Sequence, residues 1–479
     1  MDNKLARKNY RFEIDGIRAF AVIAVIINHF NKDVLPSGYL GVDIFFVISG
    51  YVITSSLAEK KNKNFWDYIS GFYERRVKRL VPALLIYVII FSILICFFDP
   101  DPISSLRTGI TSLFGISNLY LFKASTDYFA HSTQMNVFTQ TWSLGVEEQF
   151  YIIFPIIVWF TGFGRNTQKA DRNLFVSILF LVVFSLISFI YFYARNQSLA
   201  YFLMPTRFWE MAIGCLIFLT LKRKLFISKV LEKISPVIVF IGMIVVMFFP
   251  KSLATIATIS IVILSALLIS CLREGQFLFN FFTNKKITYI GLISYSLYLW
   301  HWGILAISRW TIGIHWWSIP FQLLLIIFFA VCSYKWIETP LRKKDWSTKR
   351  LKTILKGIFA IVFSTIFLIG LDKPLKGKLY LGNKKFNSST NRPYFQNLSI
   401  DKECYDMNFA GEYSHQVVLK ECLAKNRNNK QTLYFLGDSH TYAYWLGAEY
   451  LAKETNSNLF TFSYGANLFP SIKRYRINN

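Results

Sequence analysis

The sequence predicts an all-α polytopic membrane helix bundle of about eleven transmembrane helices, followed by a partial α/β segment on the extracytoplasmic side. Hydrophobic residues make up 53% of the 479 residues and charged residues only 17%, which is more apolar material than a soluble domain needs. Apolar runs near the length that spans about 30 Å of hydrocarbon recur along the chain. The expected spans are 14–30, 40–57, 82–98, 143–161, 174–193, 204–221, 235–249, 253–271, 287–308, 319–338 and 354–371.

The distribution of positive charge predicts the topology of these spans. A net charge of +25 would suggest nucleic-acid binding in a soluble protein. With the N-terminus inside, however, the inner segments hold 28 Lys and Arg and the outer segments hold 6. This is the positive-inside rule, so we expect a cytoplasmic N-terminus and no nucleic-acid partner. A twelfth span at 103–122 would reverse this asymmetry, so we expect a re-entrant or surface helix on the outer face there.

The chain divides into three expected parts. Residues 1–371 form the membrane domain, 372–430 a polar extracytoplasmic linker, and 431–479 a short α/β segment. Cys404 and Cys422 fall on the outer side, where an oxidising compartment would favour a disulfide between them. The other four cysteines lie in or beside apolar spans, and no Cys/His spacing suggests a metal site.

Ionisable residues inside the expected spans are candidates for function, because a charge in hydrocarbon is costly and usually faces the bundle interior. Arg18 and His29 are eleven residues apart and therefore share one helix face, separated by about 16 Å along the axis. Asp15 lies one turn from Arg18 and would hold its guanidinium group. The alternative is that Asp15 and Arg18 only reach back to the inner membrane surface.

Four further residues are candidates for an internal polar cavity. Asp43 lies in the second span, beside a Ser-Gly pair in which the glycine would equally well serve close packing. Glu147 and Glu148 are expected at an outer helix start, where acidic residues are favourable for electrostatic reasons alone. His301 lies among aromatic residues deep in a span. Two helices that each offer a histidine favour a shared polar cavity over isolated structural hydrogen bonds.

A dense basic cluster, ERRVKRLVP (74–82), lies at the inner end of the third span. Arg76 and Arg79 are three residues apart on a helix and would bind one polyanion together. A plain cytoplasmic anchor explains the same cluster on spacing alone.

Seven motifs follow one another along residues 10–343. They are YRFEIDGIRA, Arg18 with His29, FFVISGY, RRVKRLVP, WSLGVEEQFY, SYSLYLWHW and IETPLR. Each motif is weak alone, but in this order they resemble the acyltransferase-3 family of bacterial multi-spanning O-acyltransferases.

The resemblance implies that an acyl group, expected to be acetyl, passes from cytoplasmic acyl-CoA to an extracytoplasmic glycan such as lipopolysaccharide O-antigen or peptidoglycan. Arg76 and Arg79 match the family's paired arginines for the CoA phosphates. His29 matches its catalytic histidine, a candidate general base, and Arg18 the arginine partnered with it. The implied location is the bacterial plasma membrane, with membrane lipid and the glycan as partners.

The motif TLYFLGDSHTYAYW (432–445) predicts a strand, a tight turn and a helix. It resembles the first block of SGNH-type hydrolases, in which Ser439 would be the nucleophile and Gly465 would supply an oxyanion-hole amide. The later Asp-x-x-His block that carries the base in such enzymes does not follow Ser439 in this sequence. We therefore expect a partial SGNH-like domain in which Ser439 is inert.

Two alternative functions are compatible with buried charges in a multi-spanning chain. A non-enzymatic transporter is one, although no internal repeat of the transporter kind occurs and the GDSH segment would be unexplained. An inactive, truncated acyltransferase is the other.

The predicted topology is tested by labelling single cysteines in cells with a membrane-impermeant maleimide. With Cys404 and Cys422 replaced by serine, Ile400→Cys should react from outside and Ser228→Cys only after permeabilisation. Labelling of position 228 in intact cells would contradict both the span count and the assigned sides.

Overall fold

The computed structural model describes residues 10–58, 64–125, 133–162, 167–223, 233–375 and 378–382, two strands, and Leu451 and Glu454. The chain forms two compact units, Met1–Asn387 and Ser388–Asn479. Ser439, Gly465, Cys404 and Cys422 lie outside the described residues, as does nearly all of the expected linker.

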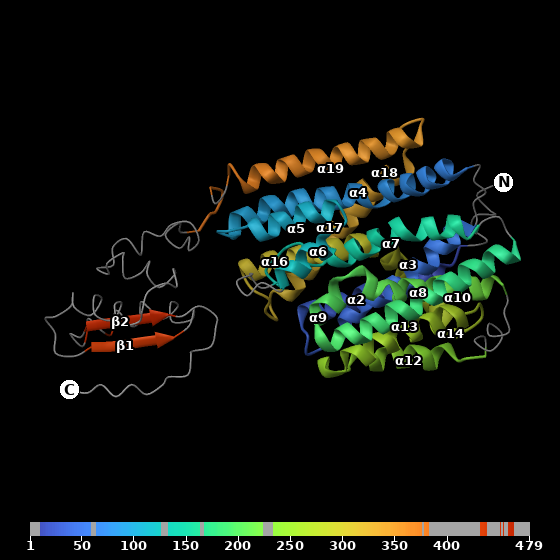
Figure 1. The fold of residues 1–479 in the computed structure, drawn as a ribbon, viewed down its shortest axis with the longest axis horizontal. Coiled ribbons are helices and arrows are strands. Elements are labelled where there is room, and N and C mark those ends of the chain that lie inside the picture. Colours follow the sequence, from blue (N-terminus) through green and yellow to red (C-terminus); the bar gives the residue numbers. More distant parts are fainter. Residues whose placement is uncertain are drawn as a thin grey trace, which may run out of the picture. The chain divides into compact units, whose positions relative to one another are not determined.

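The described part of the first unit is entirely helical (Figure 1). Its elements are α2 (Phe12–Phe30), η1 (Gly38–Leu40), α3 (Gly41–Ala58), α4 (Phe65–Phe98), α5 (Ile103–Leu113), α6 (Ser117–Ser125), α7 (Thr141–Phe160), α8 (Gln168–Arg195), α9 (Gln197–Phe202), α10 (Met204–Lys222), α12 (Pro236–Met247), η2 (Lys251–Leu253), α13 (Ala254–Cys271), α14 (Phe277–Phe282), α15 (Lys285–Leu292), α16 (Ser294–Trp310), α17 (Ile319–Cys332), η3 (Ser333–Glu338), α18 (Thr339–Lys343) and α19 (Arg350–Asp372).

Each of the predicted apolar runs falls on these helices, in agreement with a helical membrane bundle. Eight helices in the described part are long and apolar enough to cross a membrane, and α15 with α16, bent by 63° at their junction, would make a ninth. Of the other two runs, α12 has only 12 residues, and α2 carries three charged residues near its start. The count of eleven crossings therefore stays a prediction.

Residues 103–122 do not form one continuous helix. They divide into α5, with 11 residues, and α6, with 9. Gly115 separates the two helices in the left-handed backbone conformation, with φ of 68°. Because each is far shorter than the roughly 20 residues that a crossing needs, neither is a span by itself.

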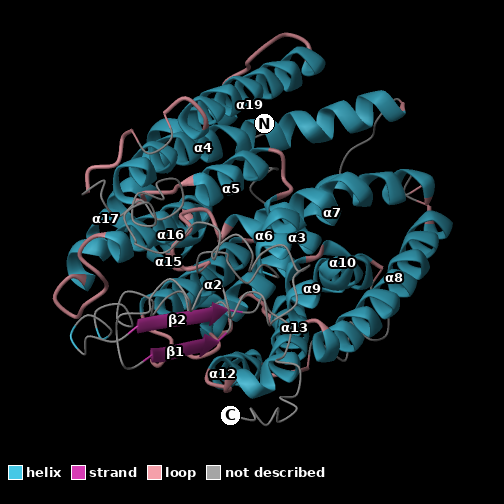
Figure 2. Ribbon diagram, turned by 60° about the vertical axis from the view of Figure 1, so that its left-hand side comes forward, coloured by secondary structure: helices cyan, strands magenta, loops and turns pink. Residues whose placement is uncertain are grey.

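Helix α2 lies inside the bundle, against α3, α15 and α16 (Figure 2). Most of its residues from Ile17 to Val25 are buried, apart from the exposed Ile23, because small residues let neighbouring backbones approach. A Cβ added to Gly291 of α15 would lie 1.8 Å from the carbonyl oxygen of Asp15. This contact holds the face of α2 that carries Asp15 against the bent α15–α16 pair.

Helices α3 and α10 pack through two glycines. A Cβ on Gly50 would lie 1.8 Å from the carbonyl oxygen of Met211, and one on Gly214 would lie 2.0 Å from that of Val47. The two backbones therefore touch directly, and Gly50 has the packing role that was one of its two interpretations.

Helix α19 is the last helix of the first unit and lies alongside α4 (Figure 1). Its N-terminal Arg350 forms ion pairs with Asp67 and, at 3.7 Å, with Glu74 of α4. Lys78 of α4 forms an ion pair at 2.9 Å with Asp345, in the segment just before α19. These contacts attach the start of α19, and the segment before it, to the N-terminal part of α4.

The described part of the second unit contains the strands β1 (Thr432–Gly437) and β2 (Asn458–Ser463). They pair in parallel, with Thr432 opposite Asn458 and Gly437 opposite Ser463. Parallel pairing requires a crossover connection between the strands, as in α/β proteins. The predicted strand before the GDSH turn is therefore present, and the SGNH-like assignment of the unit stays a prediction.

The contact between α3 and α10 predicts the cost of adding one methyl group. Gly50→Ala should lower stability by about 1–3 kcal/mol, because the new Cβ meets an immobile backbone oxygen. Gly370→Ala in α19 is the matched control, since a Cβ there meets nothing within 4 Å. Thermal unfolding of the purified protein in one detergent should show a lower Tm for Gly50→Ala alone; equal Tm values would contradict the packing argument.

Candidate active site

A cavity of about 70 Å³ lies between α2, α3, α4, α7 and α16. We call it the arginine pocket, because Arg18, Arg76 and Arg79 line it and Glu147 is its single carboxylate among the described lining residues. Three cations against one anion leave a positive charge in a low-dielectric interior, which favours a polyanionic ligand.

The first span holds Arg18 in the way the sequence predicted. The guanidinium Nη1 lies 3.7 Å from Oδ1 of Asp15, whose Oδ2 accepts a hydrogen bond of 2.7 Å from the Tyr10 hydroxyl. Asp15 itself does not line the arginine pocket. The Nε of Arg18 is buried and has no hydrogen-bond partner among the described residues, so it remains available as a donor.

The side chains of the basic cluster of α4 point to two different places, the arginine pocket and the segment before α19. Arg76 and Arg79 both line the arginine pocket, as their three-residue spacing predicted. Arg76 lies over the ring of Tyr151, 4.8 Å from its centre, while the buried Nε of Arg79 has no partner in the described part of the chain. Lys78, between them in sequence, turns away to Asp345. Different residues of one cluster thus line the pocket and form the ion pair with the segment before α19.

The two glutamates of α7 lie deeper than expected. Helix α7 begins at Thr141, so Glu147 and Glu148 lie about two turns into it and the prediction of a helix start was wrong. Glu147 faces the arginine pocket and accepts a hydrogen bond of 2.7 Å from the Ser49 hydroxyl. Glu148 points instead toward Gly115, between α5 and α6. The electrostatics of a helix N-terminus therefore do not explain either residue.

A second pocket of about 320 Å³ contains His29, and we call it the histidine pocket. It also has three cations and several aromatic and amide side chains in its lining. The two pockets share Val42 and Tyr298, which therefore separate them. The Tyr298 hydroxyl donates to the carbonyl oxygen of Gln140 at 3.0 Å and lies 2.8 Å from Oγ of Ser143, so its position is well determined.

His29 and His301 form a hydrogen-bonded pair across two helices. Nδ1 of His29 lies 2.9 Å from Nε2 of His301, and Nδ1 of His301 lies 3.1 Å from the carbonyl oxygen of Leu297. A carbonyl only accepts, so Nδ1 of His301 carries a proton and its Nε2 accepts from His29 when both rings are neutral. Nε2 of His29 is then left with a free lone pair, as a general base requires.

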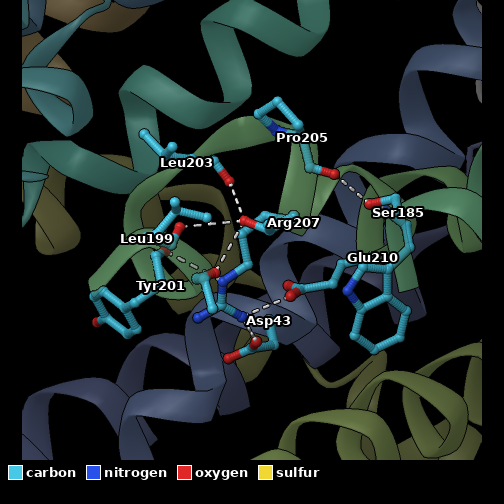
Figure 3. A network of polar contacts seen from close by, with 11 residues as sticks. Asp43, Ser185, Leu199, Tyr201, Leu203, Pro205, Arg207 and Glu210 are labelled. Carbon is cyan, nitrogen blue, oxygen red and sulfur yellow. Dashed lines mark hydrogen bonds and ion pairs between the residues drawn. The ribbon is translucent and has the colours of Figure 1, made fainter. Parts of the chain in front are cut away.

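Asp43 belongs to a buried ion triad (Figure 3). Nη1 of Arg207 lies 2.7 Å from Oδ1 of Asp43 and 2.6 Å from Oε1 of Glu210. All three residues are at most 3% exposed, and none lines either pocket. The arginine also lies 5.1 Å from the ring centre of Tyr201, which lines the histidine pocket. Asp43 thus joins α3 to α10 beneath one wall of that pocket.

Sequence reasoning missed several buried ionisable residues, of which three lie in helices that line the pockets or pack against them. Arg207 and Glu210 lie within the predicted span 204–221, so the criterion that singled out Arg18 would have found them. Glu338 is the acidic residue of the IETPLR motif and accepts a hydrogen bond of 3.3 Å from the Ser296 hydroxyl. It ends a short π-helical segment, Ser333–Glu338, a geometry that is frequent at functional sites.

Together, the fold and the pockets define a multi-helix membrane protein with two polar pockets between its helices. Residues 11–337 match the profile of the acyltransferase-3 family, described as an acyltransferase domain, and the chain belongs to this family. No solved structure matches the chain. Within the described residues, no group of His, Cys, Asp and Glu has the arrangement of a metal site.

Two curated relatives are similar over most of the chain. The protein named O-acetyltransferase OatA of Staphylococcus aureus strain NCTC 8325 is 31% identical over 76% of this chain and 63% of its own length. The Bacillus subtilis strain 168 protein named "Putative peptidoglycan O-acetyltransferase YrhL" is 30% identical over 78% of this chain and 63% of its own length. The chain therefore spans less than two thirds of each relative.

The ion triad predicts that the stability of the folded protein depends strongly on Arg207, the central cation of the triad. Arg207→Met would leave two carboxylates buried without a counter-charge, which should cost about 3–5 kcal/mol. Arg195→Met is the control, because Arg195 is exposed and forms no ion pair within the described residues. A large fall in Tm or folded yield is expected for Arg207→Met only, and an unchanged Tm would show that the triad is not needed for stability.

Proposed function

We propose that the protein is a membrane O-acetyltransferase that moves an acetyl group from a cytoplasmic acyl-CoA to an extracytoplasmic glycan. The observation that carries this proposal is the meeting of two pockets at Val42 and Tyr298. One pocket is rich in arginine and suits an anionic donor, and the other offers a histidine with a free ring nitrogen. Membership of the acyltransferase-3 family supports this enzyme over a non-enzymatic transporter.

The arginine pocket has the chemistry to bind the phosphates of acyl-CoA. Arg18 and Arg79 each have a buried Nε without a partner among the described residues, and a phosphate oxygen would satisfy such a donor. Glu147 is held by Ser49 and thereby kept in a fixed orientation among the arginines. In the predicted topology, the basic end of α4 opens this pocket to the cytoplasm, where acyl-CoA is present.

His29 would act as the general base on the other side of the Val42–Tyr298 boundary. Its Nε2 would take the proton of an acceptor hydroxyl while the hydroxyl oxygen attacks the thioester carbonyl. The new C–O bond forms, the C–S bond breaks, and CoA leaves as a thiolate that is then protonated. His301 would hold His29 in the required tautomer and stabilise its positive charge, the role that the third group has in catalytic triads.

Peptidoglycan is the acceptor favoured over lipopolysaccharide. The Bacillus subtilis relative bears peptidoglycan in its name, and both named relatives are O-acetyltransferases by name. The proposal rests on the first unit, Met1–Asn387, alone, because Ser439 of the second unit lies outside the described residues.

Substitutions of the histidine pair test the proposal through glycan acetylation in cells and CoA release by the purified full chain. His29→Ala should lower acetyl transfer by roughly 10²–10⁴-fold, because the base is lost. His301→Leu should lower kcat by about 10²-fold with little change in KM, because His29 would lose its acceptor and its tautomeric preference.

His315→Ala is the matched control, because His315 is a described histidine that lines neither pocket. It should transfer acetyl groups at the rate of the unsubstituted protein. Normal transfer by His29→Ala at normal protein level would refute the assignment of the base.

A further inference from the structure

The histidine pocket carries a concentration of positive charge that acetyl transfer alone does not require. Lys32, Lys251 and Arg309 line it, and we call these three residues the cationic rim. They come from the loop after α2, from η2 and from the end of α16. Three separate parts of the chain therefore bring a cation to one pocket.

This gathering runs against the overall charge pattern of the chain. The predicted outer loops between the spans contain only six Lys and Arg, and the three residues of the cationic rim are half of these six. Because the positive-inside rule disfavours outer cations, chance placement would scatter the few that remain. Their convergence on one pocket points to a ligand.

No carboxylate neutralises the rim within the described part of the chain. The described lining of the histidine pocket contains neither Asp nor Glu, and no ion pair joins the rim to an acidic side chain of the described residues. Partial burial and the nearby charges of Lys251 and Arg309 lower the pKa of Lys32. Arg309 is fixed by donating from Nη2 to the carbonyl oxygen of His29 at 3.2 Å, so its charge stays beside the candidate base.

The same pocket also has an unused hydrogen-bond acceptor. Gln140 lines it and is only 2% exposed. Its Nε2 donates to the Tyr87 hydroxyl at 2.7 Å, whereas its Oε1 is buried without a partner among the described residues. A buried acceptor without a donor is costly, and a ligand hydroxyl would satisfy it.

We propose that the histidine pocket binds a glycan acceptor that carries a negative charge, with the cationic rim holding a carboxylate or phosphate of the sugar. Gln140 would accept a hydrogen bond from a neighbouring hydroxyl. Aromatic side chains in the lining, among them Trp302 and Tyr201, would pack against the sugar ring. The inference rests on the proposed function, because it takes the pocket of His29 as the acceptor site.

The charge of the bound group is tested with three sugars that share one ring. They are N-acetylglucosamine, which is neutral, N-acetylmuramic acid, which adds a carboxylate, and N-acetylglucosamine 1-phosphate. Calorimetric titration of the purified full chain in neutral-lipid nanodiscs should show at least about tenfold tighter binding of an anionic sugar than of the neutral one. The preference should decrease as salt is added. Preference for one anionic sugar identifies carboxylate or phosphate as the source, and preference for both shows that charge alone is recognised.

Substitutions then locate the binding. Lys32→Gln with Lys251→Gln should abolish the preference for anionic sugars, whereas Lys32→Arg with Lys251→Arg should retain it because the charge remains. Both lysines are exposed, so neither pair should unfold the protein. Arg107→Gln is the matched control, because Arg107 is an exposed outer cation that lines neither pocket.

Equal binding of the three sugars, or a preference that survives the double glutamine variant, would overturn the inference. Because binding is measured without acetyl transfer, this result is distinct from failure of the proposed reaction. Loss of transfer in His29→Ala with an intact anion preference would support both.

Discussion

A charged group enclosed among apolar helices must be paired, hydrogen-bonded or exposed to a ligand, and the interior of this bundle follows from that constraint. Asp43, Arg207 and Glu210 balance their charges by pairing with one another, and only Oε2 of Glu210 lacks a partner among the described residues. Arg18 and Arg79 satisfy the constraint only in part, since each keeps a buried Nε without a partner among the described residues. The charges of the first group are therefore paired within the bundle, whereas the second group keeps donors that a ligand could use.

Close helix packing makes this division possible. The glycine contacts of α3 with α10 and of α15 with α2 bring backbones together without intervening side chains. Rigid helices then hold the ends of polar side chains at defined separations, such as the 2.9 Å between His29 and His301. The catalytic role that we propose for His29 needs this rigidity, because a shift of about 1 Å in a reacting group can greatly reduce the rate.

Only two residues form the boundary between the two pockets in the described part of the chain. Val42 and Tyr298 are shared by both linings, and Tyr298 is held by Gln140 and Ser143. An acyl group that passes from one side to the other would cross here, while the bulky phosphates of a donor would stay among the arginines. Two separate binding sites of this kind would keep the donor and the acceptor apart, and only the thioester of the donor would meet the acceptor at the boundary.

The sequence alone determined what depends on local pattern. Apolar runs predicted the helices, the three-residue spacing predicted that Arg76 and Arg79 share a face, and Asp15 was correctly expected beside Arg18. Only the tertiary structure decided which distant residues meet. It joined His29 to His301 over 272 residues, placed Asp43 against Arg207, and moved Glu147 from a predicted helix start into the arginine pocket. Helical periodicity predicts which residues share one face of a helix. Which other helix lies against that face depends on how all the helices pack.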